Sequence, residues 1–224
     1  MDWSYNTVWF DQLADGDVRS ADFGRPGTTP AMLLGGRYLL VRSFKSASGD
    51  FADFPSDGSV EYLDLTLANV KSFKGISSLG SVRRLELHYC LKLESDAGLS
   101  EASGSLRWLH INQSKKFHLG DELLGLSKLK VLCLNNCAAL PDLEFLSRFP
   151  HLLDFRFVNT DVLSGDLAPV LRHPTLCSVG FLNKRHYNMK FEEIKLKLAE
   201  RLAASIAVVH KGKYQTFRYT AVDA

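Results

Sequence analysis

The sequence lacks long hydrophobic runs and has little excess charge of either sign. No stretch approaches the roughly 20 consecutive apolar residues that a membrane-spanning helix needs, and the start at Met1–Asn6 has no basic segment followed by an apolar one. We therefore expect a cytoplasmic protein with no membrane association. Lys and Arg number 27 against 25 Asp and Glu, for a net charge of +2. So small an excess argues against a nucleic-acid partner.

Cysteine is scarce, and the four residues present form no recognisable metal motif. They are Cys90, Cys133, Cys137 and Cys177, with no CxxC pair and no accompanying histidine spacing. The glycines of residues 24–30 are not followed by the Lys-Ser/Thr pair of a phosphate-binding loop, and no nucleophile motif is present. We expect no metal, no cofactor and no enzymatic activity.

The charges are unevenly distributed along the chain. Residues 1–70 contain 5 basic and 10 acidic side chains, whereas residues 180–224 contain 9 basic and 4 acidic ones. One interpretation is a molecule with an acidic and a basic end that orient a charged partner. The other is that the two segments are unrelated solvated faces.

A pattern of apolar-x-x-apolar-x-apolar recurs six times at intervals of 22 to 24 residues. Its first members are Val60, Val82, Leu106, Leu129, Leu152 and Leu176, and all eighteen anchor positions are Val, Ile, Leu or Phe. Side chains alternate between the faces of a strand, so the second and third anchors point to the same side. This spacing is typical of leucine-rich repeats, in which one strand per repeat joins a parallel sheet.

The sequence therefore predicts an α/β solenoid, a leucine-rich-repeat arc of about six repeats with a parallel sheet on its concave face. We expect residues 60–187 to form the repeats, and 1–59 a cap with a degenerate first repeat near 38–59 that includes a strand at 38–44. Residues 188–224 should form a second cap. Its apolar residues recur every four positions over 191–209, which predicts a helix, and 214–219 alternate like a strand.

The residues that alternate with the buried anchors should face outward on the concave side and contact a partner. The candidates are Tyr62, Asp64, Arg84, Glu86, His88, Trp108, His110, Asn112, Asn135, Asp154 and Arg156. Tyr, Trp and Arg dominate protein–protein hot spots, and Trp108 lies near the middle of the array. Trp108 is therefore the first candidate for a central anchor.

Two other uses of these side chains remain open. His88 and His110 lie in adjacent repeats near Glu86, so an acid–base site is conceivable, although a regular strand ladder makes a poor pocket. Basic residues between 184 and 213, with Tyr187 among them, could contact phosphate. The acidic first third of the chain opposes a long nucleic-acid track.

Three segments together resemble a group of small bacterial leucine-rich-repeat proteins over roughly residues 38–190. They are Leu85–Cys90, Arg156–Asp161 with its continuation Gly165–Leu171, and Gly180–Asn188. Some members of that group are immunity proteins of contact-dependent growth-inhibition systems, which bind and block a toxin domain. The resemblance also implies a functional role for 183–187, a segment that could equally be the turn into the capping helix.

We therefore expect a protein-binding module, monomeric when free, that occludes a cognate toxin domain. A nuclease toxin tends to be basic, which would make Asp64, Glu86 and Asp154 docking charges. The alternative is a scaffold or adaptor without a toxin partner. The docking surface stays open between the concave face, the acidic end and residues 183–187.

Overall fold

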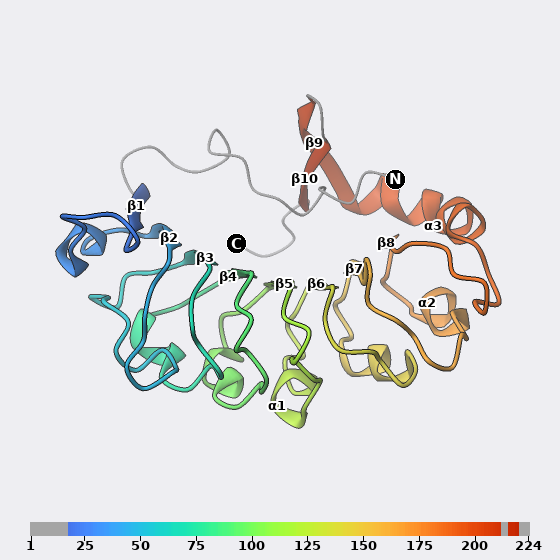
Figure 1. The fold of residues 1–224 in the computed structure, drawn as a ribbon. Coiled ribbons are helices and arrows are strands. Elements are labelled where there is room, and N and C mark those ends of the chain that lie inside the picture. The colour runs from blue at the N-terminus through green and yellow to red at the C-terminus, as the bar shows by residue number, and fades with distance from the viewer. Residues whose placement is uncertain (1–17, 212–214, 220–224) are drawn as a thin grey trace.

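The strands of this protein form one curved parallel sheet in chain order, from β1 to β8. The computed structural model describes residues 18–211 and 215–219. The strands are β1 (Val18–Asp22), β2 (Tyr38–Arg42), β3 (Tyr62–Thr66), β4 (Arg84–His88), β5 (Trp108–Asn112), β6 (Val131–Asn135), β7 (Asp154–Arg156) and β8 (Ser178–Gly180). From β2 to β8 successive strands begin 22 to 24 residues apart. The described chain is an α/β solenoid-like arc with the strands on its inner side (Figure 1).

Short helical turns connect the strands along the outer side of the arc (Figure 1). They are the 3-10 turns η3 (Pro30–Leu33), η4 (Ile76–Leu79), η5 (Leu99–Ala102) and η6 (Glu144–Arg148), and the helices α1 (Asp121–Leu124) and α2 (Ala168–Arg172). Their apolar side chains close the core from outside, as Ile76, Leu99 and Leu123 show with no exposed surface. Among the described residues, no helix combines the length and the apolar character needed to cross a membrane.

The apolar anchors occupy the core as the repeat pattern predicts. All eighteen are at most 5% exposed, and those of neighbouring strands are register partners, such as Leu63 with Leu85 and Leu85 with Leu109. Phenylalanines extend this core towards β8, where the rings of Phe155, Phe157 and Phe181 stack at centroid distances of 5.0 to 5.1 Å. Because each anchor packs on its counterparts in the next strands, the core is continuous along the arc.

A row of small polar side chains fixes the chain where each strand turns away from the sheet. Cys90, Ser114 and Thr160 lie three residues after the third anchor and are at most 1% exposed. The hydroxyl of Ser114 donates to the carbonyl of Cys90 at 3.1 Å, and that of Thr160 donates to the carbonyl of Leu134 at 2.6 Å. These side chains satisfy backbone groups that would otherwise be buried without a partner.

The region before residue 60 contributes two strands. The expected strand at 38–44 is present as β2 but ends at Arg42, because Ser43 turns the chain with a φ of 59°. The sequence did not predict β1, which pairs with β2 in parallel. Of the expected cap at 1–59, residues 1–17 lie outside the described part.

The last part of the chain begins with α3 (Phe191–Ser205), shorter than predicted. The prediction of helix up to Val209 is wrong, because Ile206–Lys211 form strand β9, which pairs antiparallel with β10 (Gln215–Tyr219). A run of β-branched residues there favours a strand over a helix. The predicted stripe is buried at Ile194 and Leu198, while the side chains of Leu202 and Ile206 lie outside the described part.

Candidate functional site

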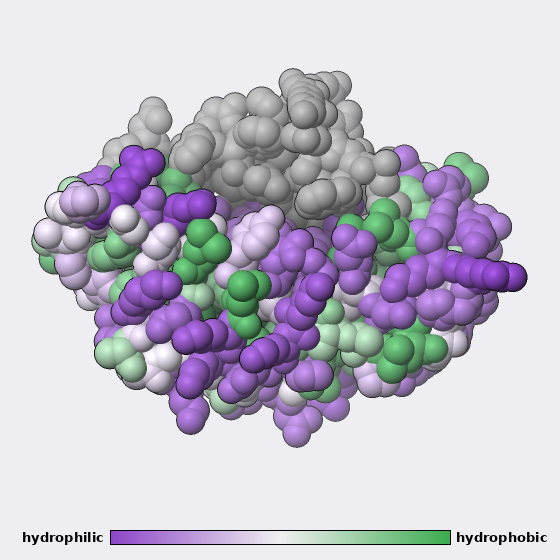
Figure 2. Space-filling view, in the orientation of Figure 1, coloured by the Kyte–Doolittle hydropathy of each residue, from purple (hydrophilic) through white to green (hydrophobic). Residues whose placement is uncertain are grey.

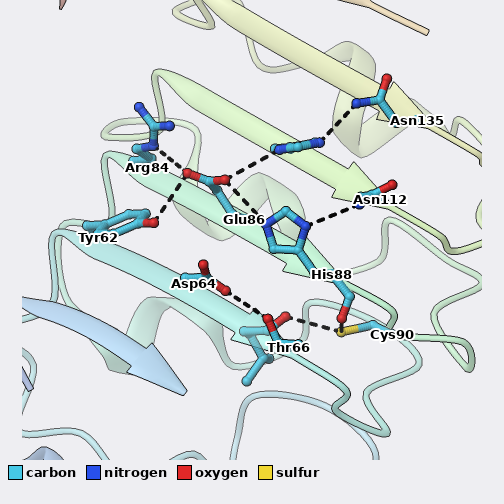
Figure 3. A network of polar contacts seen from close by, with 11 residues as sticks. Tyr62, Asp64, Thr66, Arg84, Glu86, His88, Cys90, Asn112 and Asn135 are labelled. Atoms are coloured by element: carbon cyan, nitrogen blue, oxygen red, sulfur yellow. Dashed lines mark hydrogen bonds and ion pairs between the residues drawn. The ribbon is translucent and has the colours of Figure 1, made fainter. Parts of the chain in front are cut away.

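The polar side chains of β3 to β6 form one connected network on the inner side of the sheet (Figure 3). Its centre is Glu86, which belongs to the middle of β4 and is 1% exposed. One carboxylate oxygen accepts from Nε of Arg84 at 2.7 Å and from the hydroxyl of Tyr62 at 3.3 Å. The other oxygen faces Nε2 of His88 at 3.3 Å and Nδ1 of His110 at 3.4 Å.

Arg84 links this carboxylate to two aromatic rings. Its guanidinium carbon lies 3.4 Å from the ring centroid of Trp108 and 5.6 Å from that of Tyr62. The two rings belong to β5 and β3, at register positions on either side of Arg84 in β4. Arg84 therefore combines an ion pair with cation–π contacts, and the indole of Trp108 packs on a neighbour from its own sheet.

The network fixes the tautomer of His110. The backbone N–H of Val158 donates to Oδ1 of Asn135 at 2.9 Å, so the amide nitrogen of Asn135 is the atom that faces Nε2 of His110, at 3.0 Å. Because that amide nitrogen can only donate, Nε2 must accept and is unprotonated. His110 is thus a neutral imidazole whose proton is on Nδ1, towards Glu86.

The environment shifts the pKa values of these groups in different directions. Burial raises the pKa of Glu86, but the charge of Arg84 and the bonds from both histidines outweigh it and hold the pKa well below its usual range. Burial lowers the pKa of His110, and its bond to Glu86 compensates only in part. Burial also lowers the pKa of His88, but the bond to Glu86 and the charge of Glu86 outweigh burial and raise it overall. Glu86 is therefore ionised at neutral pH.

Glu86, His88 and His110 each place one potential ligand atom within 4.8 Å of the others, so their side chains could hold a metal ion. The surrounding charges and bonds disfavour this use. Nδ1 of His110 carries a proton, by the Asn135 contact, and the cationic Arg84 lies 2.7 Å from the same carboxylate. The three side chains therefore form a hydrogen-bonded ion-pair cluster with Arg84.

A second buried ion pair lies further along the same face. The carboxylate of Asp154 accepts from Arg156 at 3.1 Å (Nε to Oδ1) and at 3.2 Å (Nη2 to Oδ2). Nη2 of Arg156 also donates to the hydroxyl of Ser178 in β8 at 3.0 Å. Both charged residues are at most 2% exposed, so this pair is part of the protein interior.

The expectation that the eleven candidate residues are free to meet a partner is wrong for most of them. In the complete chain, seven are at most 9% exposed: Tyr62, Glu86, Trp108, His110, Asn135, Asp154 and Arg156. Only Asp64, Arg84, His88 and Asn112 are partly exposed. One reason is that strands about 4.8 Å apart on the inside of an arc bring their inner side chains into mutual contact.

The burial of these side chains contradicts two specific expectations. Trp108 cannot be a solvent-exposed central anchor, because it is 9% exposed and stacked on Arg84. Glu86 and Asp154 cannot dock a basic nuclease, because Arg84 and Arg156 already neutralise them inside the protein. Asp64 keeps some exposure, and its pKa is raised by burial and by the charge of Glu86.

The segment 183–187 fixes the start of α3. The side-chain oxygen of Asn183 accepts from the backbone N–H of Phe191 at 2.7 Å, and Nζ of Lys184 lies 2.9 Å from Asp161. Tyr187 is 5% exposed, and its hydroxyl lies 3.3 Å from the carboxylate of Asp161. These contacts support the interpretation of 183–187 as a turn into the capping helix.

Sequence reasoning missed a set of residues at or just beyond the ends of the strands. Six non-glycine residues have a left-handed backbone with φ between 53° and 62°: Ser43, Leu67, Tyr89, Gln113, Asn136 and Asn159. They recur at intervals of 22 to 24 residues, and each of the first four directly follows a strand and donates its N–H to the last residue of the next one, as Leu67 does to His88 at 2.8 Å. Leu67 and Tyr89 are apolar or aromatic in an otherwise polar column, a sequence signal that the anchor pattern had passed over.

Leu67 and Tyr89 also stand out by exposure. They are 37% and 48% exposed, and Leu91, two residues further on, is 61% exposed. The last inward-facing positions of the strands, Thr66, His88 and Asn112, are partly exposed beside them. We call the set Thr66, Leu67, His88, Tyr89, Leu91, Asn112 and Gln113 the lip; it lies at the carboxyl ends of β3 to β5.

No protein-family model, curated protein or solved structure matches this chain.

Proposed function

We propose that this chain is a leucine-rich-repeat protein that binds another protein, and that the partner docks on the lip. The single observation that carries the proposal is the left-handed backbone of Leu67 and Tyr89, with φ of 59° and 56°, at positions where both side chains are exposed. For residues other than Gly, Asn and Asp this conformation costs roughly 1–2 kcal/mol. Because both side chains are exposed, packing contacts compensate for little of this cost. Backbone strain of this kind clusters at functional sites.

The composition of the lip fits a protein partner. Three apolar or aromatic side chains are flanked by the polar Thr66, His88, Asn112 and Gln113, which is the arrangement of an interface core with a polar rim. Tyr is enriched among interface hot spots, and Leu67 and Tyr89 directly follow Thr66 and His88, the last register partners of β3 and β4. By contrast, the surface in Figure 2 is mainly hydrophilic, with apolar side chains in small separated groups.

The proposed partner class is a toxin domain, which the protein would inactivate by covering its active site. This part of the proposal rests on the resemblance to bacterial immunity proteins, and the arc of strands presenting the lip at one edge supports it. His88 and Asn112 are the members of the original candidate set that lie in the lip, and Asp64 is partly exposed on the same strand as Thr66. The proposal includes no catalytic role.

Co-expression with the product of the adjacent gene tests the proposal. The protein should rescue growth against that product and bind it directly in a titration by isothermal calorimetry. Tyr89→Asn and Leu67→Asn should each weaken binding by about tenfold or more, because Asn suits the backbone but removes the contact. Leu196→Ala on α3, where the leucine is 76% exposed, is the matched control and should bind normally.

The outcomes separate the alternatives. Binding without rescue would indicate a scaffold or adaptor in place of an immunity protein. Unchanged affinity of both lip variants would remove the lip as the docking surface.

A further inference from the structure

A groove lined by basic side chains lies at the edge of the sheet opposite the lip. Its volume is about 590 Å³, and it lies at the amino ends of β4 to β6. The described residues that line it are Ser81, Arg83, Gly104, Ser105, Arg107, Lys128, Lys130 and His151. We call this set the basic groove. Among its described residues it contains two Arg, two Lys and one His, and no Asp or Glu.

The sheet itself aligns three of these cations. Arg83, Arg107 and Lys130 each directly precede a strand, so they occupy the same position in three successive repeats. The N–H of Arg107 donates to the carbonyl of Arg83 at 2.8 Å, and the N–H of Lys130 donates to that of Arg107 at 2.8 Å. Their backbone positions are therefore fixed at strand spacing, about 4.8 Å per step.

Two of the cationic groups meet at one carbonyl oxygen. Both Nη atoms of Arg107 donate to the carbonyl oxygen of Gly104 at 3.3 Å, and Nζ of Lys128 donates to the same oxygen at 3.3 Å. Like charges at neighbouring positions of a sheet repel and reduce stability. The preceding position in this row is Glu61, whose carboxylate is bound to Arg37 at 2.6 Å. An anion in the basic groove would relieve the repulsion between Arg107 and Lys128, which lie on the same oxygen.

We propose that the basic groove binds a short acidic segment of a protein, with two or three carboxylates facing Arg83, Arg107 and Lys130. Three strands span about 10 Å, which matches about three residues of extended chain. No Phe, Tyr or Trp lines the groove among its described residues, so it lacks the large aromatic surfaces on which bases stack in most single-stranded nucleic acid binding sites. The assignment does not depend on the lip, which lies at the other edge of the sheet.

The test uses the full chain and two dye-labelled peptides, one with four consecutive glutamates and one with four glutamines, together with a 12-nucleotide single-stranded RNA. Fluorescence anisotropy at about 50 mM salt should show binding of the glutamate peptide, weakened by added salt. The variant Arg83→Gln/Arg107→Gln/Lys130→Gln should bind that peptide about tenfold more weakly or worse, since exposed ion pairs act together in the groove.

The control variant is Lys92→Gln/Lys115→Gln/Lys116→Gln, which removes the same charge from exposed positions after β4 and β5. It should bind the glutamate peptide nearly as the unmodified protein does. If the triple groove variant fails to fold, Arg83→Gln/Lys128→Gln leaves the contacts of Arg107 in place and should still weaken binding several-fold. Equal losses in the groove and control variants, no binding of the glutamate peptide, or tighter binding of the RNA would each overturn the proposal.

Discussion

Glu86 and His110 are register partners in β4 and β5, and Oε2 of Glu86 lies 3.4 Å from Nδ1 of His110. The pairing joins residues 24 positions apart through a carboxylate that is 1% exposed. It shows that the inner face of the sheet is held together by charged and polar groups as well as by the apolar core beneath it. The first two predictions concern this cluster.

Replacing Glu86 by Gln should reduce the free energy of unfolding by about 3 kcal/mol. The amide cannot neutralise Arg84 or accept from both histidines, and a buried charge that loses its partner is strongly destabilising. Urea denaturation monitored by circular dichroism measures the change. Glu144→Gln is the control, because its pair with Arg172 is exposed on both sides and should contribute less than about 1 kcal/mol. Similar losses in both variants would contradict the central role of Glu86.

The two histidines should make stability depend on pH on opposite sides of about 6.5, the ordinary histidine pKa. The pKa of His88 is raised in the folded protein, so its contribution is complete below 6.5 and is lost as the pH rises through the folded value. The pKa of His110 is lowered, so stability is lost as the pH falls from 6.5 towards the folded value.

Urea denaturation of three proteins between pH 5 and 8 measures these slopes. His88→Gln should lose less stability than the unmodified protein as the pH rises above 6.5. His110→Gln should lose less as the pH falls below 6.5. Each effect stays under about 1.4 kcal/mol per pH unit, the limit for one proton. Parallel pH profiles for all three proteins would show that neither histidine carries a shifted pKa.

Leu67→Asn and Tyr89→Asn should each raise the free energy of unfolding by about 0.5–1 kcal/mol. Asn tolerates the left-handed backbone better than Leu or Tyr, and both side chains are substantially exposed. Thermal unfolding would show a higher midpoint. Leu91→Asn is the control, because Leu91 is 61% exposed but does not have a positive φ, so the same change should bring no gain. A stability gain together with weaker partner binding is the pattern expected of a functional surface.

Gly180→Ala should destabilise the protein by about 1–3 kcal/mol. A methyl group at this position would lie 2.7 Å from Cδ and Nη1 of Arg156, which is 2% exposed and held by Asp154. A side chain so confined cannot move aside without breaking its ion pair, and overpacking has a cost of this size. Gly104→Ala, where nothing lies within 4 Å, is the matched control for the same substitution. Equal stability of the two variants would mean that Arg156 is not tightly held.

The positions of β2 to β8 and the identity of the apolar anchors in the core could be read from the sequence. Leu63, Leu85 and Leu109 recur at a spacing that only a stack of short strands can bury, and alternation within each strand sends their neighbours to the other face. The apolar spacing and the alternation within a strand are both properties of a short stretch of sequence, so they can be recognised without the folded structure. The end of α3 was missed because the four-residue period of its apolar residues runs on into the β-branched run at 206–211, which instead pairs with β10.

The exposure of the inner face was decided by the tertiary structure alone. Glu86, Trp108 and Arg156 occupy the alternating positions that the sequence predicts, yet they are buried. Glu86 pairs with Arg84 of its own strand and contacts side chains of β3 and β5, Arg156 pairs with Asp154 of its own strand, and Trp108 packs on Arg84 of β4. By contrast, Leu67 and Tyr89, which directly follow the last residues of β3 and β4, remain exposed. Periodicity specifies the face on which a side chain lies, whereas its access to solvent depends on neighbours that only the folded chain brings together.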